Sequence, residues 1–185
     1  MADTHGLFDP AVRWRFTGVN HIFHAGDIGD RSVGKQLEQI VPIAVVPGNV
    51  DDNRPGRFLS DAVVELAGKR IALRHILYEG GKMTKEGRVF LDREHPDICI
   101  FGHTYQARAE WFGKTLLFNP GSAGPKRFKL PRGSGMVKIE DRMTTQHIRL
   151  RARLEEFFLL RRVLRKSWFS RALSDEAAGL SFIGA

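Results

Sequence analysis

The sequence contains one cysteine, no long apolar run and no leader pattern, and each absence narrows the classes of protein it can encode. Cys99 has no intramolecular partner for a disulfide, and its apolar surroundings at 98–101 predict a buried structural thiol. No apolar run approaches the length that spans a bilayer. The first residues lack the charged-then-apolar order of a signal peptide. These absences favour a cytoplasmic protein.

Composition and charge are those of a globular domain with a basic end. A chain of 185 residues with 42% hydrophobic and 27% charged residues can bury a sizeable core in one domain. The net charge is +8, and it favours anionic partners such as nucleic acid, an acidic membrane surface or an acidic protein. A solvated basic helix face is the alternative. The basic residues near the C-terminus are Arg149, Arg151, Arg153, Arg161, Arg162, Arg165, Lys166 and Arg171.

Short apolar runs alternate with helical patterns in the first half of the chain. Strands are predicted at 21–25 and 42–46, with a helix at 31–40 between them, an order typical of parallel strands joined by a crossover. The second half is richer in hairpins and indicates antiparallel pairs. The fold class is therefore α/β with mixed sheets. The remaining predicted elements are strands at 63–66, 70–73, 98–101, 107–111, 115–118, 136–139 and 145–150, and a helix at 82–94.

The chain divides into a domain at 1–150 and a tail at 151–185. The tail is helical in composition from 151 to 169, and its apolar residues spread around much of the helix. That surface can pack on the domain, lie on a membrane, or pair with another copy of the chain as a homo-oligomer. No aromatic-interleaved motif supports nucleic-acid binding beyond the basic charge.

Polar residues with metal-binding side chains follow the predicted strands. Asp27, Asn49, His75 and His103 each stand at or just after the end of an apolar run. Because the carboxyl ends of parallel strands meet at one edge of a sheet, we expect these side chains to converge there. Carboxylate, amide and imidazole donors suit a borderline-hard divalent ion. Two such ions about 3.5–4 Å apart can share a carboxylate and a hydroxide, and they lower the pKa of bound water toward about 7.

The order of these motifs resembles a known family. The order found in calcineurin-like metallophosphoesterases is matched by Asp3-Thr4-His5-Gly6, Gly26-Asp27, Gly48-Asn49, His75 and Gly102-His103. The sequence resembles in particular the small bacterial and archaeal phosphodiesterases of that superfamily. The resemblance runs from about residue 2 to about residue 150. It implies a four-layer α/β/β/α sandwich of mixed sheets.

The resemblance also assigns the site. Asp3 and His5 would bind the first ion, Asp27 would bridge both ions, and Asn49, His75 and His103 would complete the second. Asp51 would orient the site from behind the ligands. The catalytic set implied is Asp27, Asn49, His103 and Asp51. Manganese is the expected metal, with iron, zinc, nickel or magnesium as alternatives.

The sequence departs from the family pattern at four places. Tyr105 stands where a second histidine usually binds the first ion, and a neutral phenol with a pKa near 10 is a poor substitute. The strand that normally precedes Asp-x-His is missing, so either the sequence begins inside the domain or the sheet is rearranged, with Asp3 and His5 on a poorly anchored end. Val50 replaces a histidine acid, which favours substrates with good leaving groups. Ile76 follows His75 in place of glycine.

Other residues near the motifs have two interpretations each. Arg74 either contacts phosphate or is a solvated charge at a strand end. The loop at 119–122 either brings backbone amides to a phosphate or is a tight structural turn. Lys126, Arg127 and Lys129 follow this loop and could attract an anionic substrate.

Two functions from different classes follow from these observations. The first is a metal-dependent phosphoesterase, in particular a phosphodiesterase, in which a hydroxide bridging two metal ions attacks the phosphorus of a small phosphate ester or a nucleotide. The alternative is a catalytically weakened relative that keeps the fold as a protein-binding scaffold, as the retromer subunit that resembles this family does. Tyr105, the missing strand and the tail favour the alternative.

Overall fold

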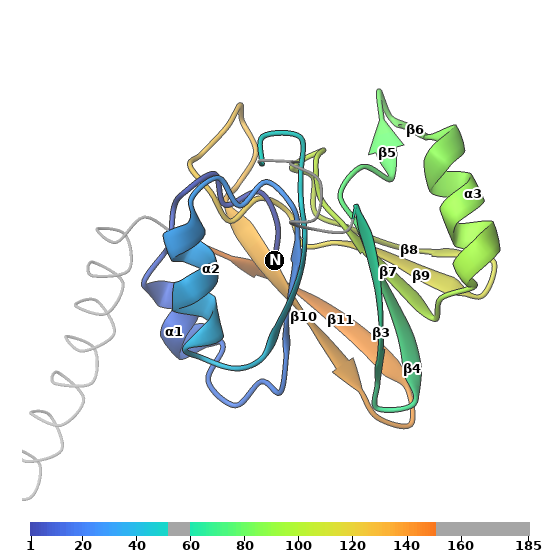
Figure 1. The fold of residues 1–185 in the computed structure, drawn as a ribbon, viewed down its shortest axis with the longest axis horizontal. Helices are drawn as coiled ribbons and strands as arrows, with labels where there is room; N and C mark the ends of the chain where they lie inside the picture. The colour runs from blue at the N-terminus through green and yellow to red at the C-terminus, as the bar shows by residue number, and fades with distance from the viewer. Residues whose placement is uncertain (52–59, 151–185) are drawn as a thin grey trace, which may run out of the picture. The chain divides into compact units, whose positions relative to one another are not determined.

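The strands of the first half pair as the sequence predicts. The computed structural model describes residues 1–51 and 60–150, shown in colour in Figure 1. Within them β1 (Ile22–Ala25) lies parallel to β2 (Ile43–Val46), and α2 (Arg31–Glu38) connects the two strands. The side chain of Asp30 caps α2 by accepting the Ser32 N–H at 2.7 Å. The predicted tail helix lies outside the described residues.

A five-stranded mixed sheet forms the second half of the domain. Its three central strands are parallel and its two edge strands are antiparallel to their neighbours, so the α/β class with mixed sheets is confirmed. The spatial order is β3 (Asp61–Leu66), β4 (Lys69–Arg74), β7 (Ile98–Phe101), β9 (Thr115–Asn119) and β8 (Arg108–Phe112).

The helix predicted at 82–94 begins three residues later. It is α3 (Lys85–Glu94), because the Thr84 hydroxyl accepts the Gly87 N–H at 3.0 Å and so caps the helix there. The residues before it form a small hairpin of β5 (Tyr78–Glu79) and β6 (Lys82–Met83), which the sequence did not predict. A second unpredicted element, α1 (Ala11–Arg15), is too short to show helical periodicity.

The first three residues are held between two parts of the chain. On one side the Ala25 N–H donates to the Met1 carbonyl at 2.9 Å, and the Asp3 N–H donates to the Gly26 carbonyl at 2.9 Å. On the other side the Gly124 N–H donates to the Asp3 carbonyl at 3.0 Å. Asp3 is 0% exposed. The expectation that Asp3 and His5 lie on a poorly anchored end is therefore wrong.

The remaining strands and three hydrophobic clusters complete the domain. The hairpin of β10 (Gly133–Ile139) and β11 (Met143–Arg149) is antiparallel, as predicted. One cluster packs α1 and α2 against β1, and a second lies between β1 and the five-stranded sheet. A third joins that sheet to α3. Among the described residues, no helix has the length and apolarity needed to cross a membrane.

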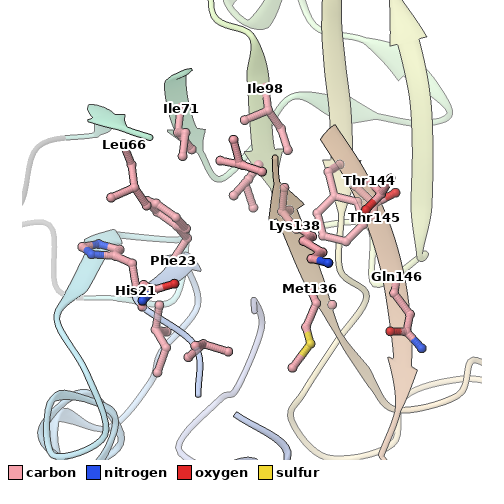
Figure 2. A pocket seen from close by; sticks show the side chains of 18 of the residues that line it. His21, Phe23, Leu66, Ile71, Ile98, Met136, Lys138, Thr144, Thr145 and Gln146 are labelled. Atoms are coloured by element: carbon pink, nitrogen blue, oxygen red, sulfur yellow. The ribbon is translucent and has the colours of Figure 1, made fainter. Parts of the chain in front are cut away.

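A groove of about 610 Å³ lies against the second cluster. Figure 2 shows Ile71 and Ile98 facing it from the five-stranded sheet, with Phe23 and Met136 on other sides. Exposed residues such as Lys138 line it together with buried ones, so it opens to solvent. Partly buried positions at the groove therefore have room that positions in the closed core lack.

We expect positions that line the groove and positions in the closed core to respond differently to a larger side chain. Leu117 is fully buried away from the groove, whereas Val137 lines it and is only partly buried. Leu117→Phe should lower the free energy of unfolding by about 1–3 kcal/mol through overpacking, while Val137→Phe should change it by less than about 1 kcal/mol. Urea denaturation of both variants measures this, and equal losses would contradict the prediction.

Candidate metal centre

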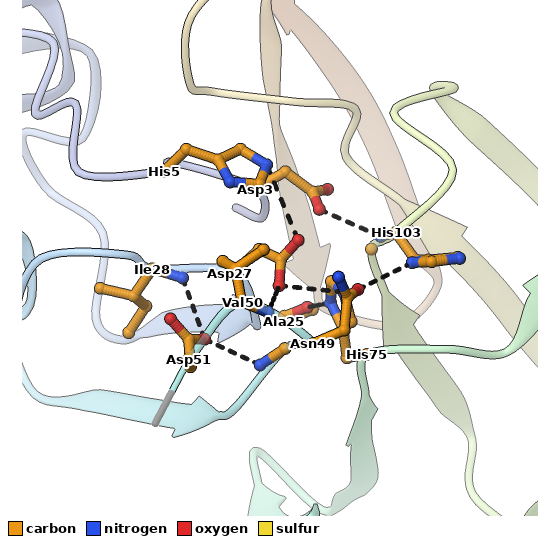
Figure 3. Close-up of polar contacts among 12 residues, drawn as sticks. Asp3, His5, Ala25, Asp27, Ile28, Asn49, Val50, Asp51, His75 and His103 are labelled. Carbon is orange, nitrogen blue, oxygen red and sulfur yellow. Dashed lines mark hydrogen bonds and ion pairs between the residues drawn. The ribbon is translucent and has the colours of Figure 1, made fainter. Parts of the chain in front are cut away.

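Four strand ends deliver polar side chains to one place. Asp27 follows β1, Asn49 follows β2, His75 follows β4 and His103 follows β7. Figure 3 shows these four side chains turned toward one another from different parts of the chain. The parallel pairing of β1 with β2 and of β4 with β7 produces this convergence, because it brings the strands' carboxyl ends to one edge.

Asp3, His5 and Asp27 form the first group of donors. One ligand atom from each lies within 4.8 Å of the other two, which is a suitable spacing for one metal ion. His5 Nε2 is 3.7 Å from Asp27 Oδ2. Asp3 reaches this group because the segment before Thr4 is bound to β1, and its other carboxylate oxygen accepts the His103 N–H at 3.1 Å.

Asn49, His75 and His103 form the second group of donors together with Asp27. Asn49 Oδ1 lies 3.1 Å from His75 Nε2 and 3.1 Å from His103 Nδ1. His75 Nε2 also lies 3.4 Å from Asp27 Oδ1. The two oxygens of Asp27 therefore face the two groups separately, as a bridging carboxylate would.

The donor side chains suit a divalent cation better than they satisfy one another's hydrogen bonds. Asp3 Oδ2 and Asp27 Oδ2 are buried and have no hydrogen-bond partner in the part of the chain that the structure describes. Buried carboxylate oxygens without a partner are costly, and a bound cation removes that cost. His75 is prepared for the same role, because its Nδ1–H donates to the Ala25 carbonyl at 2.7 Å and leaves Nε2 facing the site.

Burial and neighbouring charges shift the pKa values of the donor side chains in different directions. Burial raises the pKa of Asp3 to about 7, although nearby His75 opposes the shift. Burial also acts to raise the pKa of Asp27, but hydrogen bonds from His75 and the Val50 N–H outweigh it and lower that pKa. Burial acts to lower the pKa of His75, and its contacts with Asp27 and Ala25 raise it overall. Binding a cation at neutral pH therefore releases protons.

Asp51 holds the loops rather than facing the donors. Its carboxylate accepts the N–H groups of Ile28 at 3.1 Å, Gly29 at 2.8 Å and Gly48 at 2.7 Å. These bonds join the loop after β1 to the loop after β2 (Figure 3). Asp51 thus positions Asp27 and Asn49 relative to each other.

The loop at 119–122 is a structural turn that fixes two ligand-bearing segments. The Asn119 side-chain amide donates to the Gly102 carbonyl at 2.9 Å, next to His103. The Ser122 hydroxyl donates to the Asp3 carbonyl at 3.1 Å. Of the two interpretations of this loop, the contacts favour the structural one.

The structure corrects both interpretations of Arg74 and shows Glu79 as a further residue near the donors. Arg74 is neither solvated nor turned to the donors, because its guanidinium pairs with Asp61 on the neighbouring strand at 2.8 Å. Glu79, which the sequence did not single out, lies 3.8 Å from His103 Nε2. It comes from the short β5 strand, which gave no detectable signal.

Backbone strain is concentrated at the donors. Non-glycine residues seldom adopt positive φ, and each such position costs of the order of 1 kcal/mol or more. Neighbouring contacts keep these residues in that conformation, which points to a functional site. Among the described residues, eight non-glycine residues have positive φ, and five of them lie at the centre: Asp3 (54°), His5 (46°), Asp27 (54°), His103 (67°) and Tyr105 (59°).

Tyr105 completes the first group with a phenol. Its hydroxyl lies 3.2 Å from His5 Nε2. Burial raises the pKa of Tyr105 above its ordinary value, so the phenol stays protonated at neutral pH and is a weak ligand. The first group therefore offers fewer strong donors than the second.

The family of the chain follows from a match over most of the domain. The family model described as the calcineurin-like phosphoesterase superfamily domain matches residues 1–142. The chain belongs to this superfamily. It is 30% identical over 137 residues to a probable metallophosphoesterase of Methanothermobacter thermautotrophicus, which covers 71% of this chain and 79% of the relative.

Solved structures of similar fold include a predicted phosphoesterase and Vps29. A predicted phosphoesterase from Streptococcus pneumoniae aligns with a TM-score of 0.66 and 29% identity, over 80% of this chain and 86% of that one. Vps29 from Entamoeba histolytica aligns with the same TM-score at 17% identity, over 82% and 97%. The second likeness shows the fold alone. Membership of this superfamily implies that the chain binds divalent metal.

Gly48 leaves the space in which Asp27 lies. A Cβ at Gly48 would overlap Asp27 Oδ1 and the Asp27 backbone nitrogen. Gly48→Ala should therefore weaken Mn²⁺ binding by about tenfold or more in isothermal titration calorimetry, because the shared carboxylate is displaced. Gly34→Ala is the matched control, since nothing lies within 4 Å of its added methyl group. Unchanged binding by a folded Gly48→Ala protein would show that Asp27 does not hold the metal.

Tyr105 limits the first group, and a histidine there should strengthen it. Tyr105→His should raise Mn²⁺ affinity by about tenfold, because a neutral imidazole nitrogen coordinates divalent ions and a protonated phenol does so poorly. Tyr105→Phe should bind metal as the parent protein does. A large loss of affinity in Tyr105→Phe would mean that the phenol is itself a ligand.

Proposed function

We propose that this superfamily member is a metal-dependent phosphodiesterase with two divalent ions held in the domain at residues 1–150. The observation that carries the proposal is the placement of Asp27, whose two oxygens face separate groups of donors. Asp3 and His5 would hold the first ion with Asp27. Asn49, His75 and His103 would hold the second.

The donors combine carboxylate, amide and imidazole and include no sulfur, so they fit manganese, iron, zinc, nickel or magnesium, and manganese is the ion we propose. Two such ions, when bound, make hydroxide available at neutral pH and neutralise charge that develops at phosphorus. The chain's own contribution is to hold the donors rigidly. Asp51, Asn119 and Ser122 do so through bonds to backbone groups of the donor loops.

The side chain that follows Asn49 cannot act as an acid. This favours diesters with good leaving groups over monoesters with poor ones. Val50 follows Asn49, is half exposed, and has no proton to give to a departing alkoxide. Its N–H instead donates to Asp27 Oδ1 at 3.0 Å and fixes that carboxylate. Esters whose leaving group departs without protonation, such as aryl or other activated diesters, suit this arrangement. Nucleotides and small phosphodiesters are the substrate classes we propose.

A protein-binding scaffold is the second candidate, and Tyr105 is the observation that favours it. A phenol in the first group leaves that ion more weakly held than the second. The likeness to Vps29 supports this candidate only at the level of fold. Metal binding and turnover separate the two functions.

The catalytic proposal predicts turnover that depends on the shared and second-group donors. With Mn²⁺ the purified protein should hydrolyse bis-p-nitrophenyl phosphate, and Asp27→Ala or Asn49→Ala should lower kcat/KM by about a hundredfold or more, because metal is lost. Asp141→Ala, an exposed residue in the β10–β11 turn, should keep the parent rate. Absorbance at neutral pH follows the released nitrophenolate.

Two outcomes would reject hydrolysis. One is a folded, metal-binding protein that shows no turnover even after Tyr105→His. The other is turnover that survives both Asp27→Ala and Asn49→Ala, since it would come from another source. The first outcome would favour the scaffold.

A further inference from the structure

Two consecutive residues meet the ring of Tyr105 beside the first group of donors. The Arg127 guanidinium carbon lies 5.5 Å from the centre of the Tyr105 ring. The centre of the Phe128 ring lies 6.3 Å from it. Tyr105 in turn places its hydroxyl 3.2 Å from His5 Nε2. We call Tyr105, Arg127 and Phe128 the aromatic lip.

The loop that carries the lip is tied down at its base. The Gly124 N–H donates to the Asp3 carbonyl at 3.0 Å, so the loop starts at the metal centre. At its other end Arg132 Nε donates back to the Gly124 carbonyl at 2.6 Å, and Arg132 Nη2 pairs with Asp9 at 2.7 Å. Arg127 and Phe128 are thereby presented from a loop whose two ends are joined.

Phe128 is exposed to a degree that calls for an explanation. Its side chain is 80% exposed, more than that of any other large hydrophobic residue among those described. Its φ is 53°, in the left-handed region that L-residues disfavour. An exposed phenyl ring forgoes the stabilisation of burial, which a flat apolar group stacked on it would restore.

Arg127 carries a positive charge that no carboxylate of the described residues pairs with in a salt bridge. Among the described residues, Arg74 and Arg132 are paired with Asp61 and Asp9, whereas Arg127 makes no salt bridge. A guanidinium binds phosphate oxygens with two parallel hydrogen bonds and also lies flat on aromatic rings. The Arg127 guanidinium lies over the Tyr105 ring, and its N–H donors remain available to bind phosphate oxygens.

We propose that the aromatic lip is a subsite for phosphate esters that carry a flat aromatic group, with Arg127 binding the phosphate and Phe128 stacking on the ring. The inference rests on the proposed function, because the metal centre would hold the same phosphate. It narrows the substrate class from small phosphodiesters in general to aryl and nucleoside phosphodiesters. Esters with only aliphatic groups gain nothing from Phe128.

Binding of ligands that cannot be hydrolysed tests the lip separately from catalysis. Phenylphosphonate and methylphosphonate differ by the ring alone, and each is titrated calorimetrically into the Mn²⁺-loaded full chain. We expect phenylphosphonate to bind about tenfold more tightly, as one aromatic stack provides. The methylenephosphonate analogues of adenosine 5′-monophosphate and ribose 5-phosphate, in which a P–C bond replaces the ester bond, repeat the comparison for a nucleobase and show which of the two aromatic sources the lip prefers.

Variants assign the two roles. Phe128→Ala should remove the difference within each ligand pair and leave methylphosphonate binding unchanged, while Phe128→Trp should keep the difference. Arg127→Ala should weaken all four ligands by about tenfold, since it removes a charge-assisted contact to phosphate. Lys114→Ala is the matched control, because it removes one positive charge from an exposed position in the β8–β9 turn and should change each affinity by less than about twofold.

Several results would overturn the proposal. One is equal binding of both members of each pair by the parent protein, or binding of none of the four. Another is an equal loss of phenylphosphonate and methylphosphonate affinity in Phe128→Ala, or a loss in Lys114→Ala as large as that in Arg127→Ala. The assay with bis-p-nitrophenyl phosphate is read independently: ring-dependent binding without turnover rejects hydrolysis and keeps the lip, whereas turnover without ring-dependent binding rejects the lip alone.

Discussion

The site depends on one buried carboxylate that is shared between two groups of donors. Asp27 lies just past the end of β1, where Gly48 leaves space for it and the Val50 N–H fixes one of its oxygens. Asp51 holds the two loops that make these contacts. A carboxylate without a counter-charge is costly when buried, so the surrounding structure must hold Asp27 in place. The hydrogen bonds to the loops and the strained backbone at the donors show that it does.

The two halves of the centre are built with different strength. The second group takes its donors from the ends of β2, β4 and β7, so each side chain is fixed by a strand that is itself paired. The first group takes Asp3 and His5 from a segment held by backbone bonds to β1 and to the loop at 122–124. Its remaining position is filled by Tyr105, which adds a hydrogen bond to His5 in place of a strong ligand. The second group thus offers the stronger set of donors of the two.

Tyr105 also organises the loop next to the first group of donors. Its ring is the surface on which Arg127 and Phe128 meet, so the residue that weakens the first group also supports the aromatic lip. On the other side of the centre Val50 is exposed and Glu79 approaches His103. The rim of the site therefore differs in chemistry from one side to the other, with cation and aromatic rings beside the first group and a carboxylate beside the second.

The sequence by itself determined the α/β class, most of the strands, and the set of residues that converge. Strand-ending positions of Asp27, Asn49, His75 and His103 carried that information, because parallel strands bring their ends to one edge of a sheet. It did not reveal the β5–β6 hairpin or α1, which are too short to show a period. Only the tertiary structure decided that Asp3 is buried and anchored, that Arg74 pairs with Asp61, and that Phe128 reaches Tyr105. These are contacts between segments that are distant along the chain. Local sequence patterns do not predict which distant backbone groups or side chains will come into contact.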